Sequence, residues 1–179
     1  MTTGNDQTQG FAALPADLDA INISRDVRGV TRLIPSVCVL AVALFRASQS
    51  MGAISPLLGT ALKQLNHVIT GADIAWQAKA GPGLNLQHPT GVVIGPDVVI
   101  GPRAVIEQGA TLGASADMDA EYAVPVIGAE VLIGAGARII GSVTVGDNAK
   151  IGANAVVLRD VPDGATAVGV PARIIERGV

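Results

Sequence analysis

Aromatic side chains are nearly absent from this 179-residue sequence, where Phe, Trp and Tyr together make up 2%. The hydrophobic share is nevertheless 49%, so the core must consist of Ile, Val, Leu and Ala rather than stacked rings. Cysteine is equally scarce. A single residue, Cys38, excludes an internal disulfide and fits a reducing compartment.

An excess of positive charge and a long apolar run are missing too. The formal net charge is −3, which gives no basic surface for nucleic acid, so we expect no nucleic-acid partner. The longest apolar run, 37–45, is shorter than the roughly 20 residues of a bilayer span, and we do not expect membrane insertion. Residues 1–9 are polar and include Asp6, which is atypical of a signal peptide. The expected location is the cytoplasm.

A six-residue repeat runs from Ile94 to Pro162. Each unit starts with an aliphatic residue, usually followed by Gly, and has a small or branched residue four places later. Such a period predicts a parallel β-helix, in which short strands alternate with corners and both repeated positions point inward. The leading residues are Ile94, Ile100, Ile106, Leu112, Ile127, Ile133, Ile139, Val145, Ile151 and Val157, and the fifth-position residues are Val98, Ala104, Ala110, Val131, Ala137, Val143, Ala149, Ala155 and Val161.

The repeat has two irregularities. Weaker units led by Ile74, Ala80 and Leu86 precede the regular part and are separated from it by a two-residue slip at Val92–Val93. Later, the spacing between Leu112 and Ile127 is longer than one repeat, which predicts an extruded polar loop over 113–125. Because the register continues on both sides, the core does not need this loop, and we expect it to form an active-site wall contributed to a neighbouring chain.

The remainder of the chain divides around this coil. We expect helices over about 17–33, over about 36–51 with Pro35 in its first turn, and over about 57–68 before Gly71. The expected organisation is a flexible arm (1–15), a small helical region (16–71), the β-helix (72–163) with its loop (113–125), and a C-terminal cap (164–179).

Two histidines limit the search for catalytic groups. His67 lies near the end of the last expected helix, where we interpret it as a packing or capping residue. His88 occupies the third position of the unit Leu86-Gln-His-Pro-Thr-Gly, at a corner or on the outside, where the aliphatic rule does not apply. From position alone, His88 is a surface residue with no assigned chemistry.

The stretch from Asp73 to Arg173 resembles the catalytic half of bacterial serine acetyltransferases, which are left-handed β-helix acyltransferases. The resemblance covers about 105 of the 179 residues and includes the segment that begins at His88, the inserted loop, and Gly169-Val-Pro-Ala-Arg. It implies an all-β catalytic domain, a left-handed parallel β-helix of hexapeptide repeats, preceded by a small α-helical region.

The same resemblance implies O-acetylation of a hydroxyl with acetyl-CoA as co-substrate and without a metal. His88 matches the family's base, which removes the hydroxyl proton. Asp73 matches the carboxylate that orients the imidazole and stabilises its protonated form. The positions that match cofactor contacts are Gly113, Ala114, Ala135 and Ala153 along the pantetheine arm and Lys150 near the nucleotide phosphates. Gly and Ala also recur at such positions because turns require them.

Three departures concern the acceptor and the partners. The family's Arg-His-Pro after the loop is Ala123-Val124-Pro125 here, which removes a cation that binds the serine carboxylate. The region before the coil is short, and the C-terminus lacks the tail that docks into cysteine synthase, so we do not expect that docking. Segment 38–48 looks like exopolysaccharide-type acetyltransferases. Together these features favour a sugar or another alcohol as acceptor, with serine as the alternative.

Other classes fit less well but stay open. A γ-class carbonic anhydrase shares the coil but needs three histidine ligands for zinc, and this sequence has two histidines. A non-catalytic oligomerisation scaffold and a membrane-associated role through 37–45 are further alternatives. For the enzyme we expect a homotrimer or a dimer of trimers, with clefts shared between neighbouring chains.

Overall fold

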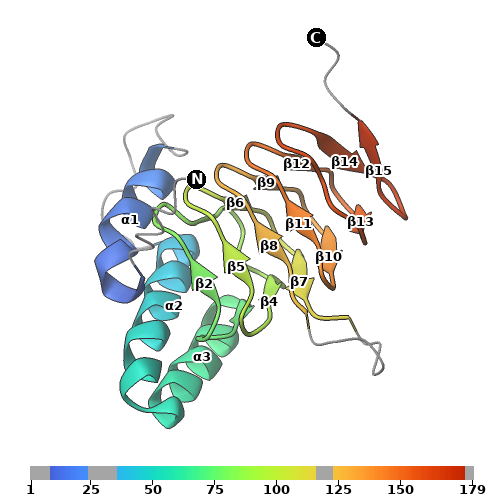
Figure 1. Cartoon of the computed structure of the whole chain (residues 1–179). Helices are drawn as coiled ribbons and strands as arrows, with labels where there is room; N and C mark the ends of the chain where they lie inside the picture. Colours follow the sequence, from blue (N-terminus) through green and yellow to red (C-terminus); the bar gives the residue numbers. More distant parts are fainter. Residues whose placement is uncertain (1–8, 24–35, 116–122, 176–179) are drawn as a thin grey trace, which may run out of the picture.

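The computed structural model describes residues 9–23, 36–115 and 123–175. Helices occupy the N-terminal part, and a coil of very short strands follows it to the C-terminus (Figure 1). The helices are η1 (Gly10–Ala13), α1 (Leu14–Ile23), α2 (Val37–Ile54) and α3 (Pro56–Thr70). Figure 1 shows α2 and α3 side by side at one end of the coil, where they close its first turn.

The helix boundaries differ from the expected ones where capping chemistry decides. Ser36 is the N-cap of α2 and accepts a hydrogen bond from the Val39 amide, so the helix starts after Pro35 rather than on it. The first-turn proline belongs instead to α3, at Pro56. Gly71 ends α3 in the left-handed conformation, as expected. The first helix, α1, begins at Leu14, and the part of its expected range beyond residue 23 lies outside the described residues.

Helix α2 is long and apolar enough by composition to cross a membrane, but 44% of it is buried inside the molecule. In its middle, the fully buried Arg46 pairs with the fully buried Asp17 of α1. The guanidinium also donates to the carbonyls of Ala80 and Gly81 in the first turn of the coil. Asp17 accepts from the amides of Gly83 and Leu84 in the same turn. This network fixes α1 and α2 to the coil and marks α2 as a core helix.

In the described part of the chain, the coil contains fifteen strands of two or three residues each. Their bounds are β1 (Asp73–Ile74), β2 (Lys79–Ala80), β3 (Asn85–Leu86), β4 (Val93–Ile94), β5 (Val99–Ile100), β6 (Val105–Ile106), β7 (Thr111–Gly113), β8 (Val126–Ile127), β9 (Leu132–Ile133), β10 (Arg138–Ile140), β11 (Thr144–Val145), β12 (Lys150–Ile151), β13 (Val156–Val157), β14 (Thr166–Val168) and β15 (Arg173–Ile175).

Every third strand stacks on the same side, which gives three parallel sheets. Sheet A contains β1, β4, β7, β10 and β13, sheet B contains β2, β5, β8 and β11, and sheet C contains β3, β6, β9, β12 and β14, to which β15 adds antiparallel. All leading and fifth-position residues predicted to point inward are buried. Burial of each large aliphatic side chain stabilises the fold by about 1.5–3 kcal/mol, so these stacked residues are its main support.

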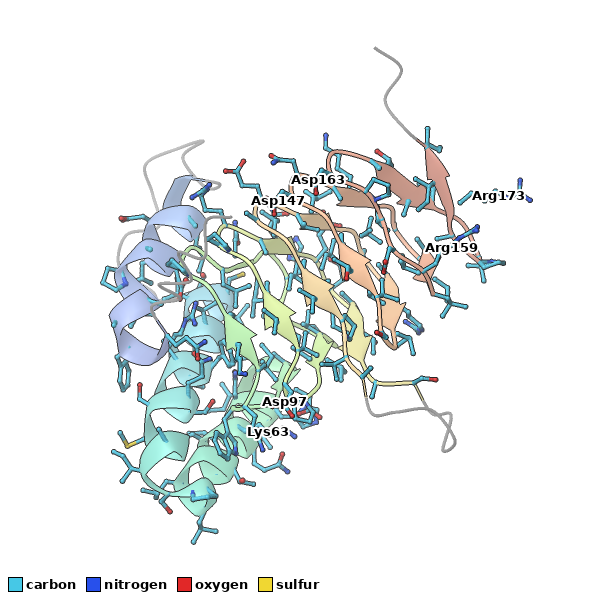
Figure 2. The ribbon with its side chains drawn as sticks, viewed as in Figure 1. Lys63, Asp97, Asp147, Arg159, Asp163 and Arg173 are labelled. Atoms are coloured by element: carbon cyan, nitrogen blue, oxygen red, sulfur yellow. The ribbon has the colours of Figure 1, made fainter. Side chains whose placement is uncertain are left out.

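The corner between sheets B and C shows how the coils are stitched together. Each corner at this edge contains a two-residue turn whose second residue has a left-handed backbone conformation, for example Gly83 in the first turn of the coil and Glu130 and Asn148 in later turns. Asp147 Oδ1 accepts from the Ala129 amide one turn below, and Asp163 Oδ1 accepts from the Asp147 amide. Figure 2 shows Asp147 and Asp163 on neighbouring turns along this edge. These side chains satisfy corner amides that no strand pairs.

Candidate functional site

His88 lies in the corner segment Gln87–Gly91, which joins β3 of sheet C to β4 of sheet A and is called the His88 corner below. Ile74 stacks on Ile94, a step two residues longer than the one from Ile94 to Leu112. The predicted two-residue insertion is therefore present, but it lies within Gln87–Gly91 rather than at Val92–Val93, since Val92 is buried in the coil and Val93 belongs to β4. Because the extra length cannot enter the packed interior, the imidazole is exposed.

Hydrogen bonds hold the His88 corner on both sides of the histidine. The Gln87 amide donates to the Ile106 carbonyl of the next turn (3.1 Å), and the buried Cys38 thiol donates to the Gln87 carbonyl (2.9 Å). Beyond the histidine, the Gly91 amide donates to the Gly71 carbonyl (2.8 Å). The main chain that carries His88 is thus tied to α2, to the end of α3 and to the second coil.

Asp73 lies beside this corner, as the first residue of β1. Its amide donates to the Val92 carbonyl at 2.8 Å, and the residue is paired in register with Val93. Its Oδ1 atom is buried and lies 2.5 Å from Lys63 Nζ of α3, with no hydrogen-bond donor in suitable geometry among the described residues. The structure thus brings Asp73 and His88 to one corner, and within the described residues no hydrogen bond joins them.

Two of the expected cofactor residues stack above His88 at the same edge of the coil. The corners here are linked vertically: the Gly109 amide donates to the Thr90 carbonyl, and the Asn154 amide donates to the Ala135 carbonyl. Ala135 is half-buried, and the Glu107 carboxylate accepts from its amide. Ala153 is exposed one turn higher. Their small side chains leave the main chain of this edge open to close approach.

The other expected cofactor residues lie elsewhere on the chain. Gly113 ends β7 and Ala114 follows it, at the opposite edge of sheet A, where the loop 113–125 leaves the coil. The middle of this loop, 116–122, is outside the described residues. Lys150 is exposed on the outer face of sheet C. One chain therefore does not bring Gly113 and Ala114 to His88.

His67 and two further residues complete the description. The His67 side chain is exposed, which contradicts a packing role, whereas its carbonyl accepts from the Gly71 amide at the C-cap of α3. Sequence reasoning missed Lys63 and the thiol contact of Cys38 because both depend on how the helices fold back onto the coil. A lysine ten residues before Asp73 gives no periodic signal that could have revealed the pair.

Comparisons with known proteins agree with this architecture. The model of bacterial transferase hexapeptide (six repeats) matches residues 125–159, and that of the hexapeptide repeat of succinyl-transferase matches residues 91–120. A serine acetyltransferase from Helicobacter pylori is 46% identical over 120 residues, which are 67% of this chain and 70% of that protein. One from Synechococcus elongatus is 39% identical over 122 residues, which are 68% of this chain and 50% of that protein.

Solved structures extend the likeness to the helices. Soybean serine acetyltransferase complexed with serine matches with a TM-score of 0.82 at 38% identity. The match covers 91% of this chain and 68% of the soybean chain. A serine acetyltransferase in complex with CoA has a TM-score of 0.81 at 36% identity, with 91% and 68% covered. The fold is the expected left-handed parallel β-helix with N-terminal helices. This chain belongs to the serine acetyltransferase family of hexapeptide-repeat acyltransferases.

Proposed function

We propose that the protein transfers the acetyl group of acetyl-CoA to the hydroxyl of L-serine and releases CoA. The observation that carries this proposal is the likeness to serine acetyltransferases over both the coil and the helices, up to 46% identity in sequence and 91% of the chain in structure. The chain spans half to about two thirds of the length of these relatives. The activity is therefore argued from the part that this chain shares with them.

This acceptor differs from the one that the sequence alone favoured. A sugar was expected because Ala123-Val124-Pro125 lacks the family's cation and because the helical region is short. The relatives favour serine instead, since the soybean enzyme with bound serine matches this chain through α2 and α3 as well as through the coil. The missing cation at Ala123 then predicts weaker rather than absent serine binding.

In the proposed reaction, His88 acts as general base. Its imidazole accepts the hydroxyl proton while the serine oxygen attacks the thioester carbonyl of acetyl-CoA. The tetrahedral intermediate then collapses, the carbon–sulfur bond breaks, and the proton passes from the imidazolium to the departing CoA sulfur. Asp73 stabilises the imidazolium and orients the ring. Exposure of His88 at a corner suits this role, because a base must reach a diffusible acceptor.

The donor is acetyl-CoA, in line with the CoA complex of a related enzyme. We propose that its pantetheine arm runs along the edge that carries Ala135 and Ala153, above the His88 corner. Gly113 and Ala114 face the opposite edge of sheet A, so they reach this cofactor only from a neighbouring chain. The proposed site is therefore shared between neighbouring chains. We propose that these chains form a trimer and that the enzyme works in the cytoplasm.

The acceptor is tested by measuring thiol release from acetyl-CoA with L-serine, L-homoserine, free sugars and nucleotide sugars. We expect turnover with L-serine at a KM in or somewhat above the usual enzyme range, up to about a few millimolar, and little turnover with the sugars. Faster turnover with any sugar or nucleotide sugar than with L-serine, at equal concentration, would overturn the assignment.

A further inference from the structure

Helix α3 carries a lysine to the carboxylate that the proposed mechanism uses. Lys63 Nζ lies 2.5 Å from Asp73 Oδ1, and the two side chains are 27% and 35% exposed. Figure 2 shows Lys63 projecting from α3 beside the first turns of the coil. The pair links helix α3, which precedes the coil, to the first strand of the coil.

The helix is held firmly at this place. Asn66 donates to the Ala41 carbonyl of α2, and the Thr70 hydroxyl both donates to Asn66 and accepts from the Ala72 amide. Three residues after Thr70 the chain enters β1 at Asp73. These hydrogen bonds fix α3 against α2 and the start of the coil, so the main chain that carries Lys63 is held in place beside Asp73.

The two carboxylate oxygens of Asp73 have different surroundings. Oδ1 is buried and has Lys63 as its ion-pair partner, without a hydrogen-bond donor in suitable geometry among the described residues. No hydrogen bond to Oδ2 is found in the described part of the chain. Because the Asp73 side chain is 35% exposed while Oδ1 is buried, Oδ2 is the carboxylate oxygen open to solvent. A buried carboxylate oxygen needs compensation, which the ammonium supplies. The other oxygen remains available for an imidazole.

We propose that Lys63 is a positioning residue: it holds Oδ1 of Asp73 and thereby presents Oδ2 to the ring N–H of His88. This inference rests on the proposed function, in which Asp73 orients His88. Without the ammonium, the carboxylate rotates about its side-chain bonds and its buried oxygen moves toward solvent. The imidazole then loses its fixed tautomer and orientation, and fewer enzyme molecules hold the base ready for proton transfer.

A purely structural role for the pair predicts an unchanged reaction rate. Thermal unfolding does not distinguish the two roles, because a pair whose side chains are 27% and 35% exposed contributes about 1 kcal/mol or less to stability even with one oxygen buried. Rate and ring tautomer, in contrast, change only if Lys63 acts through Asp73 on His88. The test therefore compares Lys63→Met with Lys63→Arg, and uses Lys79→Met as the control, since Lys79 is exposed on β2 and makes no ion pair within the described residues.

With L-serine and acetyl-CoA, we expect Lys63→Met to lower kcat about tenfold at an unchanged KM for acetyl-CoA, which corresponds to an ordinary coupling between neighbouring side chains. Lys63→Arg should recover most of the rate, and Lys79→Met should match the wild type. In an Asp73→Asn background, Lys63→Met should have no further effect. Equal losses in both backgrounds, or a wild-type kcat for Lys63→Met, would overturn the role of Lys63.

A second readout does not depend on turnover. With only two histidines, the ring ¹⁵N signals of His88 can be assigned by comparison with His88→Gln. We expect one dominant tautomer in the wild type and in Lys63→Arg, and a mixture in Lys63→Met. Identical ring signals in wild type and Lys63→Met would refute the inference. If Asp73→Asn keeps both the wild-type rate and the wild-type ring signals, the dyad of the proposed function fails as well, whereas a defective Asp73→Asn beside a normal Lys63→Met refutes Lys63 alone.

Discussion

At the scale of single residues, the placement of His88 follows from two extra residues in one corner. The regular repeat leaves no room for a polar side chain inside, and every inward position is aliphatic or small. The insertion at Gln87–Gly91 pushes the chain outward while hydrogen bonds from Cys38 and Gly91 keep its main chain in place. A catalytic histidine needs this combination of access and fixed position.

On the acceptor side, Ala123 and Val124 replace the Arg-His of the family pattern, and the arginine position can be tested. Ala123 stands where the family has an arginine, and it is half-buried at the end of the loop. We expect Ala123→Arg to lower the KM for L-serine about tenfold, because a charge-assisted hydrogen bond to the carboxylate contributes about 1.5–3 kcal/mol. Steady-state kinetics with varied serine check this prediction.

The KM for acetyl-CoA should stay unchanged in that variant. Ala123→Gln provides the matched control, since it adds a chain of similar reach without charge. If Gln and Arg lower the serine KM equally, the effect comes from bulk or hydrogen bonding, and the role assigned to the missing cation is wrong.

At the scale of elements, the buried contact between Arg46 and Asp17 fixes the helices to the coil. Both side chains are fully buried, and the guanidinium reaches Asp17, Gln49 and two carbonyls of the first turn. We expect Arg46→Met to lower the free energy of unfolding by about 3–5 kcal/mol, because it leaves the Asp17 carboxylate buried without its cation. Urea denaturation followed by circular dichroism measures the change.

Arg103→Met is the comparison for that experiment. Arg103 forms an exposed ion pair with Glu130, and its loss should cost less than about 1 kcal/mol. A similar cost for both variants would mean that the buried network does not anchor the helices. Asp17→Asn combined with Arg46→Met should recover part of the loss, because an amide oxygen can still accept from the amides of Gly83 and Leu84.

The helices also show where sequence reasoning stops. The hexapeptide period determines which residues of the coil face inward, since each strand repeats the same step, and all of those assignments are confirmed. The contacts of Arg46 and Lys63 have no period, because they join residues of separate helices to turns of the coil. Gly52 and Gly59 illustrate the same point: both lie against Trp76, where a Cβ atom would collide, and only the folded arrangement explains them.

At the scale of the whole molecule, the two parts of the expected site lie at different edges of one sheet. His88, Ala135 and Ala153 follow the edge between sheets C and A, whereas Gly113 and the loop leave from the edge between sheets A and B. Partly exposed apolar residues, Val93, Val126 and Leu132, stand on the outer faces of all three sheets. Exposed apolar residues of this kind favour side-by-side assembly of chains, and the proposed shared site requires an assembly that brings one chain's His88 to its neighbour's Gly113.

The resemblance indicates His88 and Asp73 as the candidate dyad, and the structure places Asp73 on β1, beside the His88 corner. Counting three hexapeptides per turn puts the corner after Leu86 and the corner after Leu112 at different edges of sheet A, so the separation of Gly113 and Ala114 from His88 within one chain could have been predicted from the repeat. The repeat does not indicate which oxygen of Asp73 is free, since that depends on Lys63.

The central claim is that His88 acts as the base in a cleft completed by a neighbouring chain, and mixed assemblies test it most directly. His88→Ala removes the base, and Gly113→Trp blocks the neighbour's side of the cleft at a position where a Cβ meets nothing within 4 Å. The measurement is CoA release with L-serine by each variant alone and by an equal mixture unfolded and refolded together. We predict almost no release by either variant and recovery to roughly a quarter of the wild-type rate in the mixture, the share of clefts with an intact residue from each chain in a random cyclic assembly. Wild-type release by His88→Ala, or a refolded mixture of trimers as inactive as its parts, would contradict the account.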